Sequence, residues 1–410
     1  MTSRANSKNK GREVRVVIFK ERLDPYSGFS KHVLEVSRRL LPQGYRFLIL
    51  TTQMRISSVR ELPIEPGMAV FALGGHPYGY MRTRARAIRA LLREEEPDLL
   101  DVHGGPGTVL VSRPWGVPWV FSLHAGWFSL RDLRAVPPRA WLREPKLWSL
   151  GTLLNVGLSL RGLARALRSR SPRAVAVPTR SLKEALEPLL DCPVWHIPSG
   201  VDPGLALGLP PPEEAREGLG LPPEAPVILF YGKAQLLRGV DALLEAFARV
   251  AAVHPEARLA LVLRPDAAER RITQLVARHP ARARILRVSR TTDPRPYLAA
   301  ADVVALPFRT AIALPAQPLT LLEAMACGKP VISTEIPPVR EIVTHGRDGL
   351  LVPPGDPEML AERILWALEN PKEARRLGER ARERVLNEYS WNAIAERTHA
   401  FYRRALEGGA

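Results

Sequence analysis

The segment 319–331 reads Leu-Thr-Leu-Leu-Glu-Ala-Met-Ala-Cys-Gly-Lys-Pro-Val, and its residue types suit the binding of a nucleotide. Pro318 and Thr320 predict the start of a helix, and Gly328 predicts its end. The first turn of a helix offers unpaired N–H groups and a positive dipole to a phosphate. Glu323, one turn later, can accept hydrogen bonds from ribose hydroxyls. The alternative is a core helix with a solvated glutamate.

Such residues need a framework that holds them at the edge of a sheet. The first half of the chain alternates β-like runs with helical patterns, as in residues 14–19, 30–41 and 45–51. This alternation predicts βαβ units and a parallel sheet. Gly28 lies in the turn after the first predicted strand, where a glycine lets the backbone approach a ligand at the carboxyl edge of the sheet.

A second series of the same kind begins at residue 227. It has predicted strands at 227–231, 257–263 and 303–306 and a predicted helix at 240–253. Because 410 residues exceed what one hydrophobic core serves, two domains are expected. We predict an α/β fold with two doubly wound, Rossmann-like domains. The expected parts are a disordered tail at 1–12, a first domain at 13–203, a proline-rich linker at 204–226, a second domain at 227–388, and a C-terminal helix at 389–410 that packs back on the first domain.

Basic residues are concentrated in the first half of the chain. The formal net charge is +17, and residues 1–200 contain 31 Lys+Arg against 16 Asp+Glu. This asymmetry predicts an anionic partner, which could be a membrane surface, a nucleic acid or a phosphorylated acceptor.

Two basic stretches also contain aromatic residues. Residues 131–170 hold nine Lys+Arg, with tryptophans at 127, 141 and 148, and the second stretch consists of Tyr78, Tyr80, Arg82, Arg84, Arg86 and Arg89. This composition suits an anionic membrane interface. The alternative is a solvated arginine-rich face with tryptophans in the core.

The remaining features predict a cytoplasmic protein, soluble or peripheral on the inner face of the membrane. Cys192 and Cys327 form no disulfide framework, which favours a reducing compartment. Residues 1–12 lack an apolar run, so no signal peptide is expected. The uncharged stretch 147–160 has fourteen residues, fewer than the roughly 20 that span a bilayer.

Taken in order, the motifs of this chain resemble those of retaining glycosyltransferases of family four, which have the GT-B fold of two Rossmann-like domains facing across a cleft. The resemblance covers nearly the whole chain. The block Glu323-Ala-Met-Ala-Cys-Gly-Lys-Pro is highly specific, whereas the other matches are individually weak. Those others are Gly28 and the segments at 97–103, 122–126, 197–202, 231–233, 238–241 and 300–307.

The resemblance implies a donor site for a nucleotide diphosphate sugar. Glu323 would hold the ribose, and the amides near Leu319 and Thr320 would meet the distal phosphate. Lys233 and Arg238 would clamp the diphosphate, although the family usually has the arginine first and the lysine second. Without the resemblance, these two cations would be interpreted as part of a solvated loop.

Two further residues of the first half match the family. Gly28 would approach the leaving diphosphate, although the family often has two adjacent glycines and this chain has Gly28-Phe29. His124 matches the family histidine beside the donor sugar, which can hydrogen-bond a sugar hydroxyl and help to stabilise the transition state. The alternative for His124 is a structural histidine at a strand end. His103 is assigned to the acceptor side only.

Pro315 is the main departure from the family pattern. The family has two glutamates seven residues apart, and Pro315 stands where the first of them, which usually grips donor-sugar hydroxyls, would be. Proline supplies neither an acceptor side chain nor an N–H group. One alternative is therefore a non-catalytic GT-B scaffold or partner protein.

The expected reaction moves a hexose to an acceptor, with retention of anomeric configuration, and the leaving diphosphate takes the acceptor proton. The expected acceptor is a glycan or a lipid-linked precursor. No metal is expected, because the resemblance implies that Lys233, Arg238 and helix amides hold the leaving diphosphate, and the lack of an Asp-x-Asp motif is consistent with this. No nucleic acid is expected, because no nucleic-acid-binding signature accompanies the charge. An epimerase on the same fold would leave the block at 323–330 unexplained.

Overall fold

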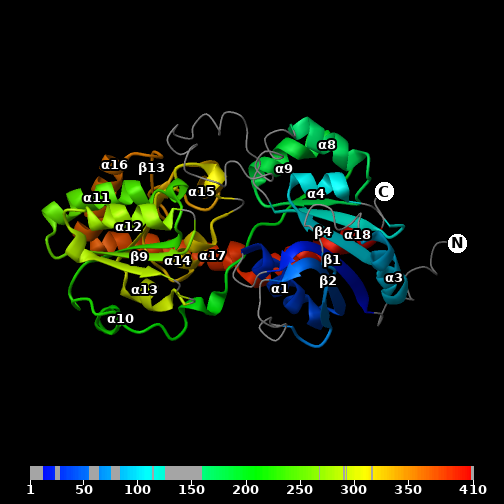
Figure 1. Ribbon diagram of the computed structural model, residues 1–410, viewed down its shortest axis with the longest axis horizontal. Helices are drawn as coiled ribbons and strands as arrows, with labels where there is room; N and C mark the ends of the chain where they lie inside the picture. Colours follow the sequence, from blue (N-terminus) through cyan, green and yellow to red (C-terminus); the bar gives the residue numbers. More distant parts are fainter. Residues whose placement is uncertain are drawn as a thin grey trace. The chain divides into compact units, whose positions relative to one another are not determined.

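The computed structural model describes residues 13–23, 28–54, 64–74, 84–112, 115–124, 159–266, 268–289, 291, 293–314 and 317–407. These residues form two compact units (Figure 1). The first unit contains the described residues up to 124, those from 159 to 199, and the C-terminal residues from 391 onward. The second unit contains the described residues from 200 to 390.

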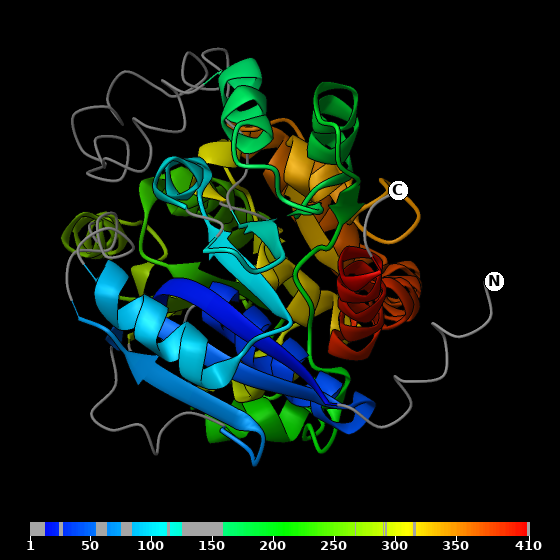
Figure 2. The same ribbon diagram turned by 90° about the vertical axis from the view of Figure 1, so that its right-hand side faces the viewer.

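The first unit is built on a parallel sheet. Its strand order, over the described residues, is β3-β2-β1-β4-β5-β6-β7. The strands are β1 (Val14–Leu23), β2 (Tyr45–Met54), β3 (Met68–Ala72), β4 (Leu99–Gly104), β5 (Trp119–Leu123), β6 (Val175–Val177) and β7 (Val194–His196). Figure 2 shows β1 and β2 in blue beside the cyan strands of the same sheet.

Both faces of this sheet are covered, which explains the continuous apolar run 16–19 in the middle of β1. Val16 and Ile18 pack on one face in a cluster that includes Val33 of α1 and Phe401 of α18. Val17 packs on the other face. The helices are α1 (Gly28–Leu40), α3 (Ala85–Glu95), α4 (Pro106–Val111), α8 (Leu160–Arg168), α9 (Arg180–Leu186) and α18 (Trp391–Leu406), with short 3-10 turns at Leu41–Gln43 and Glu187–Leu189.

The C-terminal helix α18 belongs to the first unit and packs against α1. Its end is held by Arg173, whose Nη1 donates a hydrogen bond to the carbonyl of Ala405 at 2.7 Å.

The second unit repeats the same strand order. Its parallel sheet runs β10-β9-β8-β11-β12-β13. The strands are β8 (Val227–Lys233), β9 (Arg258–Arg264), β10 (Ile285–Ser289), β11 (Val303–Leu306), β12 (Val331–Thr334) and β13 (Leu350–Val352). The helices are α10 (Pro212–Gly218), α11 (Val240–Val253), α12 (Glu269–Ala277), α13 (Arg295–Ala300), α14 (Leu319–Ala326), α15 (Pro337–Arg340), α16 (Pro357–Glu369) and α17 (Pro371–Tyr389). Short 3-10 turns lie at Pro203–Ala206, Leu236–Arg238, Arg282–Arg284 and Ala311–Ala313.

The prediction of two doubly wound α/β domains is therefore confirmed. In each sheet the strand order reverses beside the first strand, between β1 and β4 and between β8 and β11. The loops at the carboxyl ends of such strands diverge at this point, and ligands of doubly wound folds bind there. Residues near the ends of β1, β4, β8 and β11 are consequently the first candidates for function.

The prediction of a linker at 204–226 was wrong. This segment contains α10, which packs against α13 in the second unit. Arg216 of α10 is buried and donates from Nη2 to both carboxylate oxygens of Asp302 at 2.9 Å. Prolines therefore shape a packed segment here rather than a spacer. The tail predicted at 1–12 lies outside the described residues.

Candidate active site

The loop after β8 holds the two cations that the sequence singled out. Lys233 ends β8, and Arg238 ends the 3-10 turn that follows. Gly239 completes the turn with φ 79°, and a Cβ at this position would lie 1.8 Å from the carbonyl oxygen of Pro307. Only glycine fits this approach, so the backbone that carries Arg238 is held against the end of β11.

Lys233 and Arg238 lie in a region with an excess of positive charge. The guanidinium of Arg238 lies over the ring of Phe308, 5.6 Å from its centre. Lys233 Nζ lies 3.6 Å from the carboxylate of Asp266, which also accepts a hydrogen bond from Gln235. Burial, followed by the charge of Arg264, lowers the pKa of Arg238 to about 10.

The pKa of Lys233 is lowered as well, by burial first and by the neighbouring arginines Arg264 and Arg238, while Asp266 opposes the change. One carboxylate thus faces several cations that repel one another. A bound polyanion would relieve this repulsion, because its negative charges would offset the positive charges of the cations, which burial has deprived of part of their solvation.

The start of α14 lies beside these cations. A Cβ built on Gly232 would lie 3.7 Å from Nη1 of Arg238 and 4.0 Å from Cγ2 of Thr320, so Gly232 separates the loop from the helix. Pro318 precedes α14 without a side-chain cap, and the first turn contains no acidic residue. The N–H groups of Leu319 and Thr320 have no partner within the helix, as in the first turn of any α-helix. An anion is favoured at this end.

Glu323 is positioned by Tyr231 of β8. The Tyr231 hydroxyl donates to the carbonyl of Thr320 and lies 3.3 Å from Oε2 of Glu323. Burial and the charge of Glu323 hold the pKa of Tyr231 well above its ordinary value, so the hydroxyl keeps its proton as a donor. A fixed carboxylate near the open start of a helix can accept hydrogen bonds from the hydroxyls of a ribose.

The first unit has its own polar cluster at the carboxyl edge of its sheet. His124 follows β5, and its Nε2 hydrogen-bonds Nδ1 of His103 on β4. His103 Nε2 lies 2.8 Å from the carboxylate of Asp101. The rings of Phe29 and His32, both on α1, lie 5.2 and 5.1 Å from the ring of His124. Gly28 begins α1 beside them.

Burial keeps two histidines of this cluster neutral. Burial lowers the pKa of His32 to about 3, with the nearby His103 adding to the effect. The pKa of His124 is held well below its ordinary value by burial, then by His103, His32 and Lys20. The pKa of Lys20 is also lowered by burial. At neutral pH, His124 is therefore a neutral group that can exchange hydrogen bonds with a hydroxyl.

The sequence interpretation gave no site role to Asp101, Ser122, Tyr402 or His32, although Asp101 and Ser122 lie in segments that match the family. Asp101 is buried and accepts hydrogen bonds from Ser122 Oγ at 2.7 Å and from the Tyr402 hydroxyl at 2.6 Å. The spacing of Asp101 and His103, two residues apart in a strand, was a usable signal that they share a face. Nothing in the sequence links Asp101 to Tyr402, which lies 301 positions further along.

The predicted site residues therefore form two groups. Lys233, Arg238, Leu319, Thr320 and Glu323 lie together in the second unit, and His124 and Gly28 lie together in the first. Pro315 lies outside the described residues, as do Tyr78, Tyr80, Arg82 and most of the basic segment 131–170.

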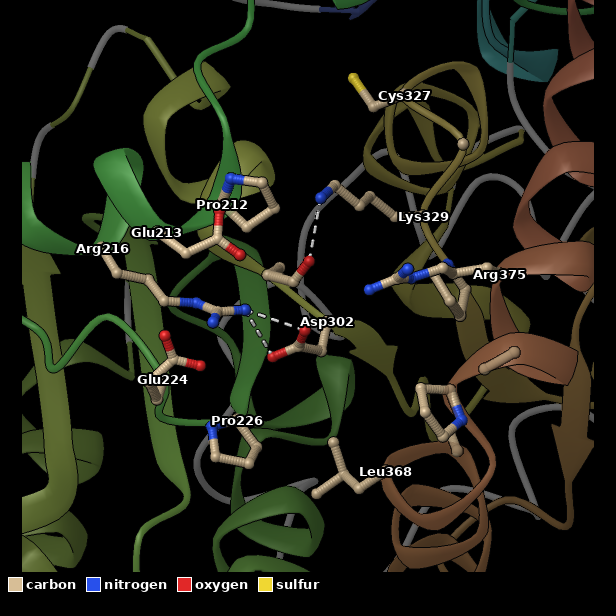
Figure 3. Close-up of a pocket in the computed structure, with 16 residues that line it drawn as sticks. Pro212, Glu213, Arg216, Glu224, Pro226, Asp302, Cys327, Lys329, Leu368 and Arg375 are labelled. Atoms are coloured by element: carbon tan, nitrogen blue, oxygen red, sulfur yellow. Dashed lines mark hydrogen bonds and ion pairs between the residues drawn. The ribbon is translucent and has the colours of Figure 1, made fainter.

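A cavity of about 580 Å³ in the second unit lies at the other edge of the sheet (Figure 3). It is lined by Pro226, Ala301 and Pro330, which precede β8, β11 and β12. Its Lys329 donates from Nζ to the carbonyls of Ala299 and Ala301, at 3.0 and 2.9 Å. The lysine of the Gly-Lys-Pro motif thus binds the end of α13 and is structural.

Within the described part of the chain, no helix is long and apolar enough to cross a membrane. The same residues contain no group of three or more His, Cys, Asp or Glu side chains arranged to hold a metal ion.

Comparison with known families assigns both halves of the chain. Residues 26–205 match the family model Glycosyltransferase Family 4, and residues 212–384 match the model Glycosyl transferases group 1. The chain is a glycosyltransferase of these families. The predicted family resemblance and the prediction of an enzyme are thereby confirmed.

Its relatives include proteins named D-inositol 3-phosphate glycosyltransferase. The one from Thermobispora bispora is 28% identical over 416 residues, covering 93% of this chain and 90% of the relative. The one from Segniliparus rotundus is 34% identical over 230 residues, covering 51% of this chain and 47% of the relative.

Solved structures confirm the fold of this glycosyltransferase. Sucrose-phosphate synthase from Thermosynechococcus elongatus superposes with a TM-score of 0.77 at 23% identity, covering 96% of this chain and all of that one. HepE of Anabaena, solved in complex with UDP and glucose, has a TM-score of 0.73 at 17% identity, covering 95% of this chain and all of that one.

We predict that His32→Phe removes part of the pH dependence of stability. The unfolded chain binds a proton at His32 near pH 6.5, whereas the folded protein binds it only near pH 3, so stability is lost as the pH falls below 6.5. Between about pH 7.5 and about pH 5 the wild type should lose about 2 kcal/mol through this residue. Urea denaturation at both pH values measures it. Equal pH dependence in wild type and variant would contradict the prediction.

Proposed function

We propose that this glycosyltransferase moves a hexose from a nucleotide diphosphate sugar to an acceptor, with retention of anomeric configuration. The observation that carries the proposal is the grouping, at the end of β8, of two partly desolvated cations, the open start of α14 and a glutamate held by Tyr231. These three features match a diphosphate, its distal charge and a ribose.

The donor class has independent support from the comparisons. HepE of Anabaena, which shares the fold, was solved with UDP-glucose and with UDP and glucose. Because its identity to this chain is 17%, this likeness concerns the fold and leaves the base and sugar of this chain to experiment.

In the proposed reaction, the acceptor oxygen attacks the anomeric carbon on the face that the diphosphate leaves. The bond between the anomeric carbon and the diphosphate oxygen breaks, and the leaving diphosphate takes the acceptor proton. Lys233 and Arg238 stabilise the charge that develops on the leaving group. His124 hydrogen-bonds a hydroxyl of the sugar. Gly28 allows the backbone to approach the diphosphate, and no protein base is required.

For the acceptor, we propose an anionic molecule, either a phosphorylated polyol or a lipid-linked precursor. The relatives named D-inositol 3-phosphate glycosyltransferase favour a phosphorylated polyol. The net positive charge of the first half of the chain suits both. Described residues add a row of exposed arginines on α8, at positions 161, 165 and 168.

We predict that Glu323→Gln weakens donor binding. A panel of nucleotide sugars titrated into the full chain by calorimetry should show one preferred donor, hydrolysed slowly without acceptor. The variant should bind that donor about tenfold more weakly, because a neutral amide accepts poorer hydrogen bonds from the ribose.

Glu358→Gln on α16 is the matched control, because this exposed glutamate pairs with Arg249 away from the site. No binding of any donor by the wild type would contradict the proposal and favour a non-catalytic scaffold, in which Pro315 has removed donor recognition. Equal donor affinity in the wild type and in Glu323→Gln would contradict the proposed binding of the ribose by Glu323.

We propose that the chain also associates with anionic membranes through α8, and the expected effect is loss of binding in a triple variant. Arg161→Gln, Arg165→Gln and Arg168→Gln together should reduce sedimentation with phosphatidylglycerol vesicles, because each arginine near such a surface contributes about 1 kcal/mol.

A control with the same loss of charge is Arg375→Gln, Arg376→Gln and Arg380→Gln on α17, which are also exposed. Equal sedimentation of the two triple variants, or no preference of the wild type for anionic over neutral vesicles, would contradict the proposal.

A further inference from the structure

One face of the first sheet changes from apolar to polar along three neighbouring strands. Residues 16, 18 and 20 of β1 are Val, Ile and Lys, residues 99, 101 and 103 of β4 are Leu, Asp and His, and residues 120, 122 and 124 are Val, Ser and His. The register pairs Lys20 with His103 and His103 with Ser122. Paired residues of parallel strands share a face, so these polar side chains form one cluster under α1 and α18.

The central hydrogen-bond acceptor of this cluster is the carboxylate of Asp101. Its carboxylate is 1% exposed and accepts hydrogen bonds from Ser122 and from Tyr402 on α18. An ionised carboxylate has no proton to give, and two donors already stabilise its negative form. The contact with His103 at 2.8 Å must therefore be donated by His103 Nε2.

The hydrogen bond between His103 and His124 depends on the one between His103 and Asp101. A neutral imidazole carries one proton, and Nε2 of His103 uses it for Asp101. Nδ1 of His103 is then an acceptor, so the bond that joins it to His124 must be donated by Nε2 of His124.

We propose that Asp101 and His103 act as positioning residues that fix the tautomer of His124, with the proton on Nε2 and Nδ1 left as a hydrogen-bond acceptor. In the proposed transferase, His124 then accepts a hydrogen bond from a sugar hydroxyl and does not donate one. Tyr402 extends the chain to the C-terminal helix, so α18 supports the site as well as the core. This role for His124 rests on the proposed function, whereas the tautomer does not.

The charges around His124 agree with a ring that carries a single proton. The groups that face it are Lys20 from β1, His32 from α1, and Asp101 and His103 from β4, with Tyr402 from α18 reaching Asp101. Burial and the basic neighbours lower the pKa of His124, so the choice between its two nitrogens is a real one at neutral pH.

The proton positions can be measured directly. Long-range ¹H–¹⁵N correlation spectra of the ¹⁵N-labelled full chain distinguish protonated from unprotonated ring nitrogens, and single histidine substitutions assign the signals. The wild type should show His103 and His124 both protonated at Nε2 only. A His124 ring protonated at Nδ1, or a doubly protonated His103, would overturn the proposal without any variant.

Asp101→Asn tests the cause. Its amide can donate to His103 Nε2, which reverses the chain and moves the proton of His124 to Nδ1, as an Asp-to-Asn change beside a histidine can select the wrong tautomer. With the donor identified by the calorimetric panel, the kcat of its hydrolysis should fall at least about tenfold with little change in KM, because a hydrogen bond of the transition state is lost. His103 and His124 should change tautomer together, and a change in one ring without a change in the other would refute the assignment.

Tyr402→Phe is the milder variant in case Asp101→Asn does not fold. It removes one donor from Asp101 and should shift the ¹H and ¹⁵N signals of His103. Tyr45→Phe is the matched control, because Tyr45 packs beside Tyr402 but hydrogen-bonds His399. Equal effects of both tyrosine variants on the His103 signals would contradict the proposed series of hydrogen bonds from Tyr402 through Asp101 to His103. Nucleotide binding should be unchanged in Asp101→Asn, Tyr402→Phe and Tyr45→Phe. A wild type that binds no nucleotide would refute the proposed function but would leave the tautomer assignment standing.

Discussion

Burial of the parallel strands on both faces confines polar chemistry to their ends. In the second unit, Val227 to Phe230 are fully buried, and the first residues of β8 that reach solvent are Gly232 and Lys233. In the first unit, Val16 to Phe19 are buried and Lys20 follows. Since all strands of a sheet are parallel, these ends meet at one edge, and the reversal of strand order opens that edge to a ligand. The position of both polar clusters follows from this constraint.

The two clusters differ in how they manage burial. At the end of β8, like charges are held close together, and burial lowers the pKa of Lys233 and brings that of Arg238 to about 10. This arrangement gains from an anion. In the first unit, burial instead keeps His32 and His124 neutral, and the buried carboxylate of Asp101 is satisfied by three hydrogen-bond donors. This arrangement suits hydrogen bonding to an uncharged hydroxyl.

The sequence predicted the fold well where local patterns decide it. The strand 303–306 and the helix 240–253 have the predicted bounds, because apolar runs and turn residues mark them. Helix α14 also begins and ends near Pro318 and Gly328 as expected. Local patterns failed at 204–226, where proline content suggested a spacer, because the ion pair of Arg216 with Asp302 joins residues 86 positions apart.

The same distinction applies to the sites. Lys233, Arg238 and Glu323 were identified through a family motif, and the structure adds the reason for their grouping, namely Gly232 and Gly239 in the connecting loop. The hydrogen bonds from Tyr402 to Asp101 and from Tyr231 to Glu323 join distant parts of the chain, and no spacing rule predicts them.

The proposed function depends on the binding of a diphosphate by Lys233, Arg238 and the start of α14. The most direct measurement is calorimetric titration of a nucleoside diphosphate, and of the monophosphate of the same nucleoside, into the wild type and Arg238→Gln. We predict that the wild type prefers the diphosphate by about 10- to 100-fold. Arg238→Gln should lose most of this preference, because a charged hydrogen-bond donor to the second phosphate is gone. Equal affinity of the wild type for both nucleotides, or an undiminished preference in Arg238→Gln, would contradict it.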